Sequence, residues 1–283
     1  MLKIAIQSKG RLNEKSIQLL TDSGINVAGA SRSLTAVATG FPLEVLYLRD
    51  DDIPQAVAMG VADIGIVGQN EVAESGQNVK EVMKLGFGAC RISLAVPKNC
   101  GYESLEWFDG KRVATSYPKI LADFFNKKNI KARIHKIAGS VEVAPAVGLA
   151  DAIFDIVSSG GTLVQNGLVE VEKVFPSEAV LISTPELSDE KNSLLQKLLL
   201  RFNSILESRG YKYVLMNIPS SAINEAVAMM PGMKSPTLIP LAREGWHALQ
   251  VVIHESDLWD KIESMKKIGA EDILVLDLEN IIR

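Results

Sequence analysis

The sequence predicts an α/β protein made of two similar lobes and a smaller terminal block of order βαββαβ. In residues 2–67 and 112–157, short apolar stretches alternate with amphipathic ones, which is typical of a parallel sheet covered by helices on both faces. The tetrapeptide Gly60-Val-Ala-Asp63 returns 88 positions later as Gly148-Leu-Ala-Asp151, which indicates a repeated lobe. Residues 211–278 follow the order of the ferredoxin-like motif.

The composition is that of an ordinary globular protein. The chain has 283 residues, of which 47% are hydrophobic, 23% charged and 6% aromatic, so it can bury the cores of two or three domains. Disordered, fibrous and coiled-coil classes are excluded. The net charge of −4 leaves no basic stripe for a phosphate backbone, so nucleic acid is not an expected partner. An anionic ligand must therefore meet Lys or Arg side chains placed at its site.

The cysteines and the apolar segments indicate the compartment. Cys90 and Cys100 have no partner cluster among only three histidines, so neither a zinc site nor a disulfide framework is predicted. The start of the chain lacks the charged leader and cleavage site of a signal peptide. No segment approaches the ~20 consecutive apolar residues of a membrane span. We expect a cytoplasmic protein with no membrane partner.

The first lobe is expected in residues 1–90, with a returning segment at about 180–210 completing it. Asp52 is a good N-cap acceptor, and Pro54 tolerates the loss of an amide proton in a first helical turn. The expected elements, in order, are strand 2–7, a helix ending at Gly24, strand 43–48, a helix from Asp52 to about Gly60, and strand 62–67.

The second lobe is expected in residues 91–179, and residues 90–96 are expected to cross into it from the first. A two-lobed α/β chain places its ligand in the cleft, at the carboxyl ends of its strands. The expected elements are strand 112–115, helix 118–128, strand 132–137, helix 141–147 and strand 152–157, followed by strand-like segments 169–174 and 179–182.

The terminal block begins after a leucine-rich helix. Residues 189–209 carry an apolar stripe at helical spacing, which suits a core or a subunit interface, and they end at Gly210. The domain 211–283 then follows, and ferredoxin-like modules at the end of an enzyme often sense a ligand. Its expected elements are strand 211–217, helix 220–230, strands 237–241 and 246–253, helix 256–268 and strand 272–278.

The segment most suited to bind phosphate lies between Asp155 and Thr162. The sequence lacks a P-loop and a complete dinucleotide motif. At the end of a buried strand, small residues let successive backbone N–H groups converge, and the following helix adds its positive end. Ser158, Ser159 and Thr162 add hydroxyl donors, and Asp155 suits sugar hydroxyls or a metal. The alternative is a plain Ser/Gly turn that caps a helix.

In its surroundings this loop resembles the signature of the ATP phosphoribosyltransferases, which begin histidine biosynthesis. The resemblance covers essentially the whole chain, and its length and terminal block are similar to the long form of the family. The motifs that carry it are residues 141–163, Lys9-Gly-Arg-Leu12, Leu48-Arg-Asp-Asp-Asp-Ile-Pro54, Ala114-Thr-Ser-Tyr-Pro118, Pro231-Gly232 and Ser235-Pro-Thr237.

The resemblance implies a reaction and a fold. The N1 atom of ATP is joined to the ribose C1 of phosphoribosyl pyrophosphate, pyrophosphate is released, and Mg²⁺ is needed. Two lobes of the type II periplasmic-binding-protein fold are implied, with an ACT-like regulatory domain, inhibition by histidine, and assembly into dimers and hexamers. Position 154 is Phe where the commoner phosphoribosyltransferase pattern has a second acid, so only Asp155 is carried over.

Site residues follow from the resemblance and from the chemistry. Departure of pyrophosphate separates charge, so we expect positioning and electrostatic stabilisation without a covalent nucleophile. Asp155, Glu142 and Arg49 are the expected catalytic residues, with Glu142 and Asp155 as candidate ligands of Mg²⁺. The expected substrate-binding residues are Lys9, Arg11, Asp50, Tyr117, Ser158, Ser159, Gly160, Gly161 and Thr162. The alternatives are solvated surface charges for the cations and a turn-shaping role for Asp50.

Other polar residues are given structural roles. Asp63 and Asp151 occupy equivalent turns of the two lobes, and the three histidines lie in strand-like contexts. The resemblance places regulatory histidine at Asn217, Met233, Ser235, Thr237 and Asp272, with an ordinary helix-to-strand loop as the alternative. A second class of function also remains, a two-lobed solute-binding or effector-sensing protein without catalysis.

Overall fold

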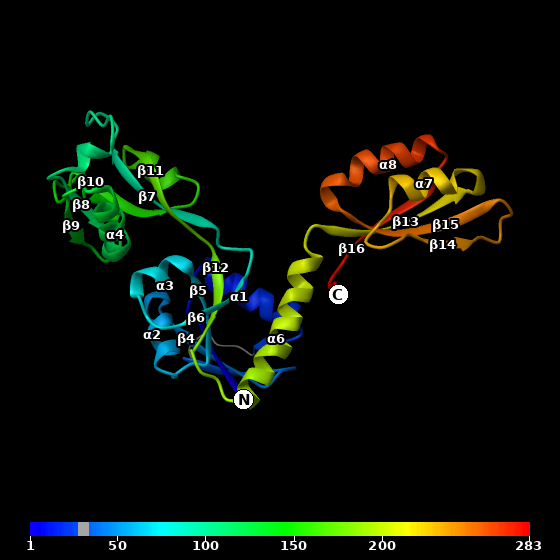
Figure 1. Ribbon diagram of the computed structural model, residues 1–283, viewed down its shortest axis with the longest axis horizontal. Coiled ribbons are helices and arrows are strands. Elements are labelled where there is room, and N and C mark those ends of the chain that lie inside the picture. The colour runs from blue at the N-terminus through cyan, green and yellow to red at the C-terminus, as the bar shows by residue number, and fades with distance from the viewer. Residues whose placement is uncertain (28–33) are drawn as a thin grey trace. The chain divides into compact units, whose positions relative to one another are not determined.

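The computed structural model describes residues 1–27 and 34–283, and these form two compact units (Figure 1). The first unit, residues 1–195, contains a seven-stranded and a five-stranded sheet; the second, residues 196–283, contains a four-stranded sheet. Helix α6 (Asp189–Ser208) runs across the division. No helix in the described part of the chain is long and apolar enough to cross a membrane.

The first lobe has a mostly parallel centre with an antiparallel strand inserted near one edge. β1 pairs parallel with β4 and β5, whereas β12, which comes much later in the chain, pairs antiparallel with β5 and β6. Across the sheet lie β2 (Asn26–Val27), β3 (Thr35–Thr39), β4 (Leu43–Leu48), β1 (Leu2–Gln7), β5 (Ile64–Gly68), β12 (Ala179–Ser183) and β6 (Lys80–Lys84). The helical segments are α1 (Arg11–Asp22), η1 (Asp50–Asp52), α2 (Ile53–Ala58) and α3 (Gln69–Ser75).

The second lobe repeats this construction. β10 pairs parallel with β8, and β8 with β9, whereas β7 lies antiparallel between β10 and β11. Across the sheet lie β11 (Leu168–Ser177), β7 (Cys90–Pro97), β10 (Ala152–Val157), β8 (Arg112–Thr115) and β9 (Arg133–Lys136). The helical segments are η2 (Leu105–Phe108), α4 (Pro118–Lys128), η3 (Val141–Val143) and α5 (Gly161–Gln165). The predicted pair of type II periplasmic-binding-protein lobes is confirmed.

Three local predictions are wrong. Residues 90–96 do not cross between the lobes, because they form β7 inside the second sheet. The connections run instead before β7 and after β11, side by side, with Leu85 N donating to the Ala179 carbonyl at 2.9 Å. Asp52 is the N-cap residue of α2, but its side chain does not accept the predicted capping hydrogen bond, because a 3₁₀ turn leads into that helix. The expected helix 141–147 is only the 3₁₀ turn Val141–Val143.

The repeated tetrapeptide has the structural role expected of it. Asp63 accepts a hydrogen bond from the Lys3 amide at 2.8 Å, at the start of β1. Asp151 accepts one from the Arg112 amide at 2.8 Å, at the start of β8. In each lobe this carboxylate ties the turn before one strand to the first amides of its neighbour. Asp63 also holds Lys191 at 2.7 Å.

The terminal unit has helices on one face of its sheet, as Figure 1 shows for α7 and α8. Their apolar residues pack on alternate residues of the two central strands, with Met216, Leu249 and Met265 fully buried. The sheet order is β14 (Thr237–Pro240), β15 (Trp246–His254), β13 (Tyr211–Pro219) and β16 (Glu271–Asp277). The helical segments are η4 (Ser220–Ala222), α7 (Ile223–Met229), η5 (Glu255–Asp257) and α8 (Leu258–Lys267). This is the predicted βαββαβ order.

Candidate active site

Basic side chains of the first lobe follow two neighbouring parallel strands. β1 and β4 are in register to their carboxyl ends, where Gln7 lies opposite Leu48. Lys9 and Arg11 follow β1, Arg49 follows β4, and all three are exposed. The structure therefore places the three predicted cations at one edge of the first sheet.

Arg49 is already engaged by a neighbouring carboxylate. Its Nε and Nη2 donate to the two carboxylate oxygens of Asp51 at 3.1 and 3.3 Å. The pair is open to water, with side-chain exposures of 74% and 54%, so it is a weak pair that a phosphate can replace. Asp50 is oriented differently, because Gln7 Nε2 donates to it at 3.2 Å. Asp50 thus links the ends of β1 and β4.

The loop of the second lobe connects β10 to the short helix α5. Gly160 is the N-cap of α5 with φ 82°, a left-handed conformation that favours glycine. No side chain caps this helix in the described chain, and the glycine at its N-cap is compatible with both the phosphate site and the plain Ser/Gly turn. Because α5 has only five residues, its positive end contributes less than that of a long helix, which leaves the loop's own amides and hydroxyls as the main candidate donors.

A hollow of about 350 Å³ brings residues of both lobes together. Arg11 of the first lobe faces it, beside Glu142 and Asp155 of the second. Of the predicted site residues, the lining contains Arg11, Glu142, Asp155, Ser158, Ser159, Gly160 and Thr162. Lys9, Arg49, Asp50, Tyr117 and Gly161 are not part of this lining, so the structure does not bring the whole predicted set to one place.

Asp155 is the most perturbed acid of this hollow. Burial raises its pKa to about 6; the bond from the Ile156 amide at 2.8 Å opposes the shift, and the charge of Glu142 adds to it. The two carboxylates thus lie close enough to interact. Within residues 1–27 and 34–283 no cluster of three or more metal-ligating side chains occurs. A pair of carboxylates fits Mg²⁺, which takes its other ligands from water and substrate phosphates.

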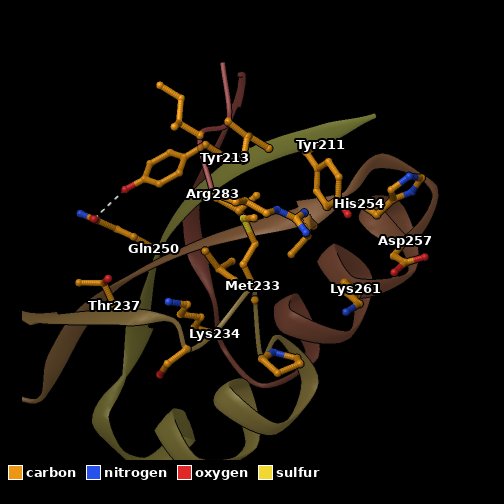
Figure 2. Close-up of a pocket in the computed structure, with 18 residues that line it drawn as sticks. Tyr211, Tyr213, Met233, Lys234, Thr237, Gln250, His254, Asp257, Lys261 and Arg283 are labelled. Carbon is orange, nitrogen blue, oxygen red and sulfur yellow. Dashed lines mark hydrogen bonds between the residues drawn. The ribbon is translucent and has the colours of Figure 1, made fainter. Parts of the chain in front are cut away.

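The terminal unit has a separate cavity of about 920 Å³, drawn in Figure 2. Met233, Ser235 and Thr237, three of the predicted regulatory residues, line it. Sequence reasoning missed the residues of the opposite wall, although Tyr211 and Tyr213 alternate on one strand and therefore share a face. The further labelled lining residues are Lys234, Gln250, His254, Asp257, Lys261 and Arg283.

The other two predicted regulatory residues lie elsewhere in the sheet. Asn217 Nδ2 donates to Asp272 Oδ2 at 3.0 Å, on the paired strands β13 and β16. β16 and β14 form opposite edges of this sheet, so Asp272 and Thr237 do not meet within the unit. His254 lines the cavity and also accepts the Ser256 amide at 3.3 Å, so it has the structural bond that was expected.

Comparisons with known proteins agree with the two-unit division. A family model described as ATP phosphoribosyltransferase matches residues 49–204, and one described as HisG, C-terminal domain matches residues 208–280. An ATP phosphoribosyltransferase of Parabacteroides distasonis is 55% identical over 282 residues, and one of Bacteroides thetaiotaomicron is 53% identical; each match covers 100% of both chains. The chain belongs to the ATP phosphoribosyltransferase family.

A solved structure supports the family at the level of the fold. The ATP phosphoribosyl transferase (HisG:HisZ) complex from Thermotoga maritima contains a chain 30% identical to this one, with a TM-score of 0.64. The match covers 73% of this chain and 99% of that one. The two lobes described above are therefore the lobes of this family.

In this member of the family the lobes also touch through a half-buried acid that sequence reasoning missed. The Tyr117 hydroxyl, at the start of α4, donates to Glu71 on α3 at 2.9 Å. Asn70 Nδ2 donates to the same carboxylate at 2.8 Å and to the Tyr117 hydroxyl at 3.2 Å. Tyr117 is only 7% exposed, so in this arrangement it is enclosed and open to no ligand. The sequence signal for this contact is the position of Glu71 just after β5, the third parallel strand of the first lobe.

A second acid of α3 extends this contact. Glu74 accepts hydrogen bonds from the backbone amides of Lys119 and Ile120 at 3.0 Å, so it caps α4 from the other lobe. Burial raises the pKa of Glu71 to about 7, with the charges of Asp50, Asp51 and Glu74 adding to the shift and the Tyr117 hydroxyl opposing it. Glu71 also raises the pKa of the Tyr117 hydroxyl, after burial itself.

Glu71→Gln is expected to stabilise the protein increasingly as pH rises. The folded protein binds the Glu71 proton more tightly than the unfolded chain, so wild-type stability falls between the ordinary glutamate range and pH 7. Glutamine keeps an acceptor for the Tyr117 hydroxyl, and because it does not titrate, the variant does not lose stability in this pH range. The gain in unfolding free energy, measured by urea denaturation, should grow by at most about 3 kcal/mol between pH 5 and pH 8.

The matched control is Glu81→Gln, which neutralises an exposed carboxylate of the same lobe that accepts from Gln69. Its effect should stay nearly constant over this pH range. A Glu71→Gln difference that is equally flat would contradict the buried-acid assignment.

Proposed function

We propose that this chain joins N1 of ATP to the ribose C1 of phosphoribosyl pyrophosphate, releasing pyrophosphate in the first step of histidine biosynthesis. The enzyme class implies these two substrates, and enzymes of this family generally need a divalent metal. The observation that carries the assignment of the site is the hollow where Arg11 of one lobe meets Asp155 and the small-residue loop of the other.

The loop and Arg11 suit the departing pyrophosphate. Breaking the C1–oxygen bond moves negative charge onto this group, and preorganised donors stabilise such charge best. Ser158, Ser159 and Thr162 offer hydroxyls, and Arg11 offers a guanidinium fork for two phosphate oxygens. No nucleophilic side chain is needed, since the ring nitrogen of ATP attacks C1 directly.

Asp155 and Glu142 can stabilise the positive charge that develops on the ribose. The ribose becomes cationic as the bond breaks, and two nearby carboxylates stabilise that cation or hold the ribose hydroxyls. These two residues would also hold Mg²⁺, which supplies charge neutralisation at the pyrophosphate when bound. Entry of a cation lowers the pKa of Asp155, so substrate binding keeps it ionised at neutral pH.

The first-lobe edge is assigned to ATP. Lys9 and Arg49 are exposed cations at the ends of β1 and β4, where a triphosphate can displace Asp51 from Arg49. Asp50 beside them suits a hydroxyl donor of the substrate. A contact between adenine and Tyr117 requires the Glu71–Tyr117 contact to open, since the ring is enclosed without it.

Asp155→Ala should lower kcat roughly 10²-fold without unfolding the protein, the cost of losing one preorganised electrostatic group. The assay mixes the protein with ATP, phosphoribosyl pyrophosphate and Mg²⁺ and follows the new adenine absorbance together with pyrophosphate release. Thr162→Val, nearly isosteric, is the companion variant and should mainly raise the KM for phosphoribosyl pyrophosphate.

Two outcomes would contradict this assignment. A folded Asp155→Ala protein with wild-type kcat/KM would remove Asp155 from the site. If Thr162→Val weakened only ATP binding, the two substrates would be assigned to the wrong lobes. A wild-type protein that binds both substrates but forms no product would support the solute-binding alternative.

The regulatory proposal places histidine in the cavity of the terminal unit. Met233, Ser235 and Thr237 give it one wall with hydroxyl groups, and Asp257 and Lys261 bring charges of both signs for the amino and carboxyl groups. The other two predicted regulatory residues, Asn217 on β13 and Asp272 on β16, are hydrogen-bonded to each other and lie outside this cavity. Dimers and hexamers remain the proposed assemblies.

Thr237→Arg should raise the histidine concentration for half inhibition about tenfold while leaving uninhibited turnover near wild type, as loss of a typical coupling free energy implies. Arginine fills the cavity from its rim, where Thr237 is exposed. The control is Ile239→Arg, an exposed residue of the same strand outside the lining. The measurement is the initial rate across a histidine titration. Identical inhibition curves for both variants and wild type would contradict a histidine site in this cavity.

A further inference from the structure

Arg91 stands beside the phosphate loop but outside the hollow described above. It lies on β7 opposite Val157, the last residue of β10 before the loop. Its Nη1 donates to the carbonyl oxygen of Ser158 at 3.0 Å. Its Nε and Nη2 donate to the two carboxylate oxygens of Glu170 on β11, and the buried Ser93 hydroxyl donates to the same carboxylate at 2.7 Å.

These bonds fix the direction of the guanidinium. The side chains of Arg91 and Glu170 are 30% and 20% exposed, so the pair is better enclosed than an ordinary surface pair. The planar fork of Arg91 engages Glu170 with two nitrogens and leaves the third for one further acceptor. That acceptor is the Ser158 carbonyl, which is thereby held on the β7 side of the loop.

A fixed carbonyl also fixes the amide that follows it. The Ser158–Ser159 peptide is trans, as are all described peptide bonds, so its C=O and N–H point in opposite directions. Arg91 lines a hollow of about 650 Å³ on one side of the loop, and Asp155 lines the smaller hollow; Ser159 and Gly160 line both. With the carbonyl turned to Arg91, the Ser159 N–H points away from Arg91.

We infer that Arg91 is a positioning residue for the transfer reaction, which fixes the Ser159 N–H for a phosphate group of phosphoribosyl pyrophosphate before that substrate arrives. The inference rests on the proposed function of the loop. A donor that needs no reorganisation during the reaction is worth more than one that must first be turned. Arg91 itself touches the loop backbone and Glu170, and acts only through them.

The same lobe contains a matched control. Arg112 donates its Nε and Nη2 to Asp151 at 3.2 and 2.8 Å, and its Nη1 to the carbonyl oxygen of Gly148 at 3.0 Å. Its side chain is 39% exposed and that of Asp151 33%. The arrangement matches that of Arg91 in chemistry, but Asp151 precedes β10 whereas the phosphate loop follows it.

The experiment compares Arg91→Met with Arg112→Met in the full chain. Initial rates are measured with each substrate varied at saturation of the other, and urea denaturation reports folding. Arg91→Met is expected to raise the KM for phosphoribosyl pyrophosphate about tenfold and to leave the KM for ATP within about twofold. Arg112→Met is expected to change stability alone. Arg91→Lys, which keeps the charge but cannot hold Glu170 and the carbonyl together, should resemble Arg91→Met.

The possible outcomes distinguish failure of the positioning role of Arg91 from failure of the function proposed for the loop. Thr162→Val is run alongside, because that hydroxyl belongs to the loop site itself. If Thr162→Val raises the KM for phosphoribosyl pyrophosphate and neither Arg91 variant does, the positioning role is overturned and the loop keeps its function. If none of these variants changes that KM, the loop is not the site. Equal effects of Arg91→Met and Arg112→Met on both KM values would reduce Arg91 to a structural residue. If Arg91→Met fails to fold, the Arg91→Lys protein decides.

Discussion

The antiparallel pairing of β7 with β10 supports the strand and the loop that carry the proposed site of the second lobe. β10 carries Asp155 and ends at the phosphate loop, and β7 places Ser93 opposite Asp155 and Arg91 opposite Val157. One strand therefore supports Asp155, the proposed catalytic acid, and supplies the cation that holds the loop backbone. Without this inserted strand, β10 would be an edge strand, and its carboxyl end would have no such support on that side.

The first lobe uses the same device with β12 beside β5, and the paired connections tie the lobes together. Burial then gives each lobe one acid of raised pKa, Asp155 in the second lobe and Glu71 in the first. Both substrates are polyanions and the chain carries a net charge of −4. A pKa of about 6 leaves Asp155 mostly ionised at neutral pH, so cations such as Arg11 must offset the repulsion that these substrates meet there.

Regular periodicity made the fold predictable, and local packing limited the prediction of the site. The alternation of strands and helices and the repeated tetrapeptide predict two lobes. Asp63 and Asp151 each accept a hydrogen bond from the backbone amide at the start of a neighbouring strand. The sequence does not predict the inserted strand, because the apolar run of residues 90–97 has no signature that distinguishes a crossing between lobes from a strand. The small residues and hydroxyls of the loop after Asp155 predict a phosphate site, and the structure places this loop beside Arg11. Glu71 and Arg91 were missed because their roles depend on partners 46 and 79 positions away.

Amide hydrogen exchange of the loop tests the central claim most directly. The full chain is exchanged alone, with ATP and Mg²⁺, and with phosphoribosyl pyrophosphate and Mg²⁺. The account predicts that phosphoribosyl pyrophosphate slows exchange in residues 158–162 by about tenfold or more, and that ATP leaves these amides nearly unchanged while protecting residues 49–52. Protection of residues 158–162 by ATP alone, or none there with phosphoribosyl pyrophosphate at saturation, would contradict the account.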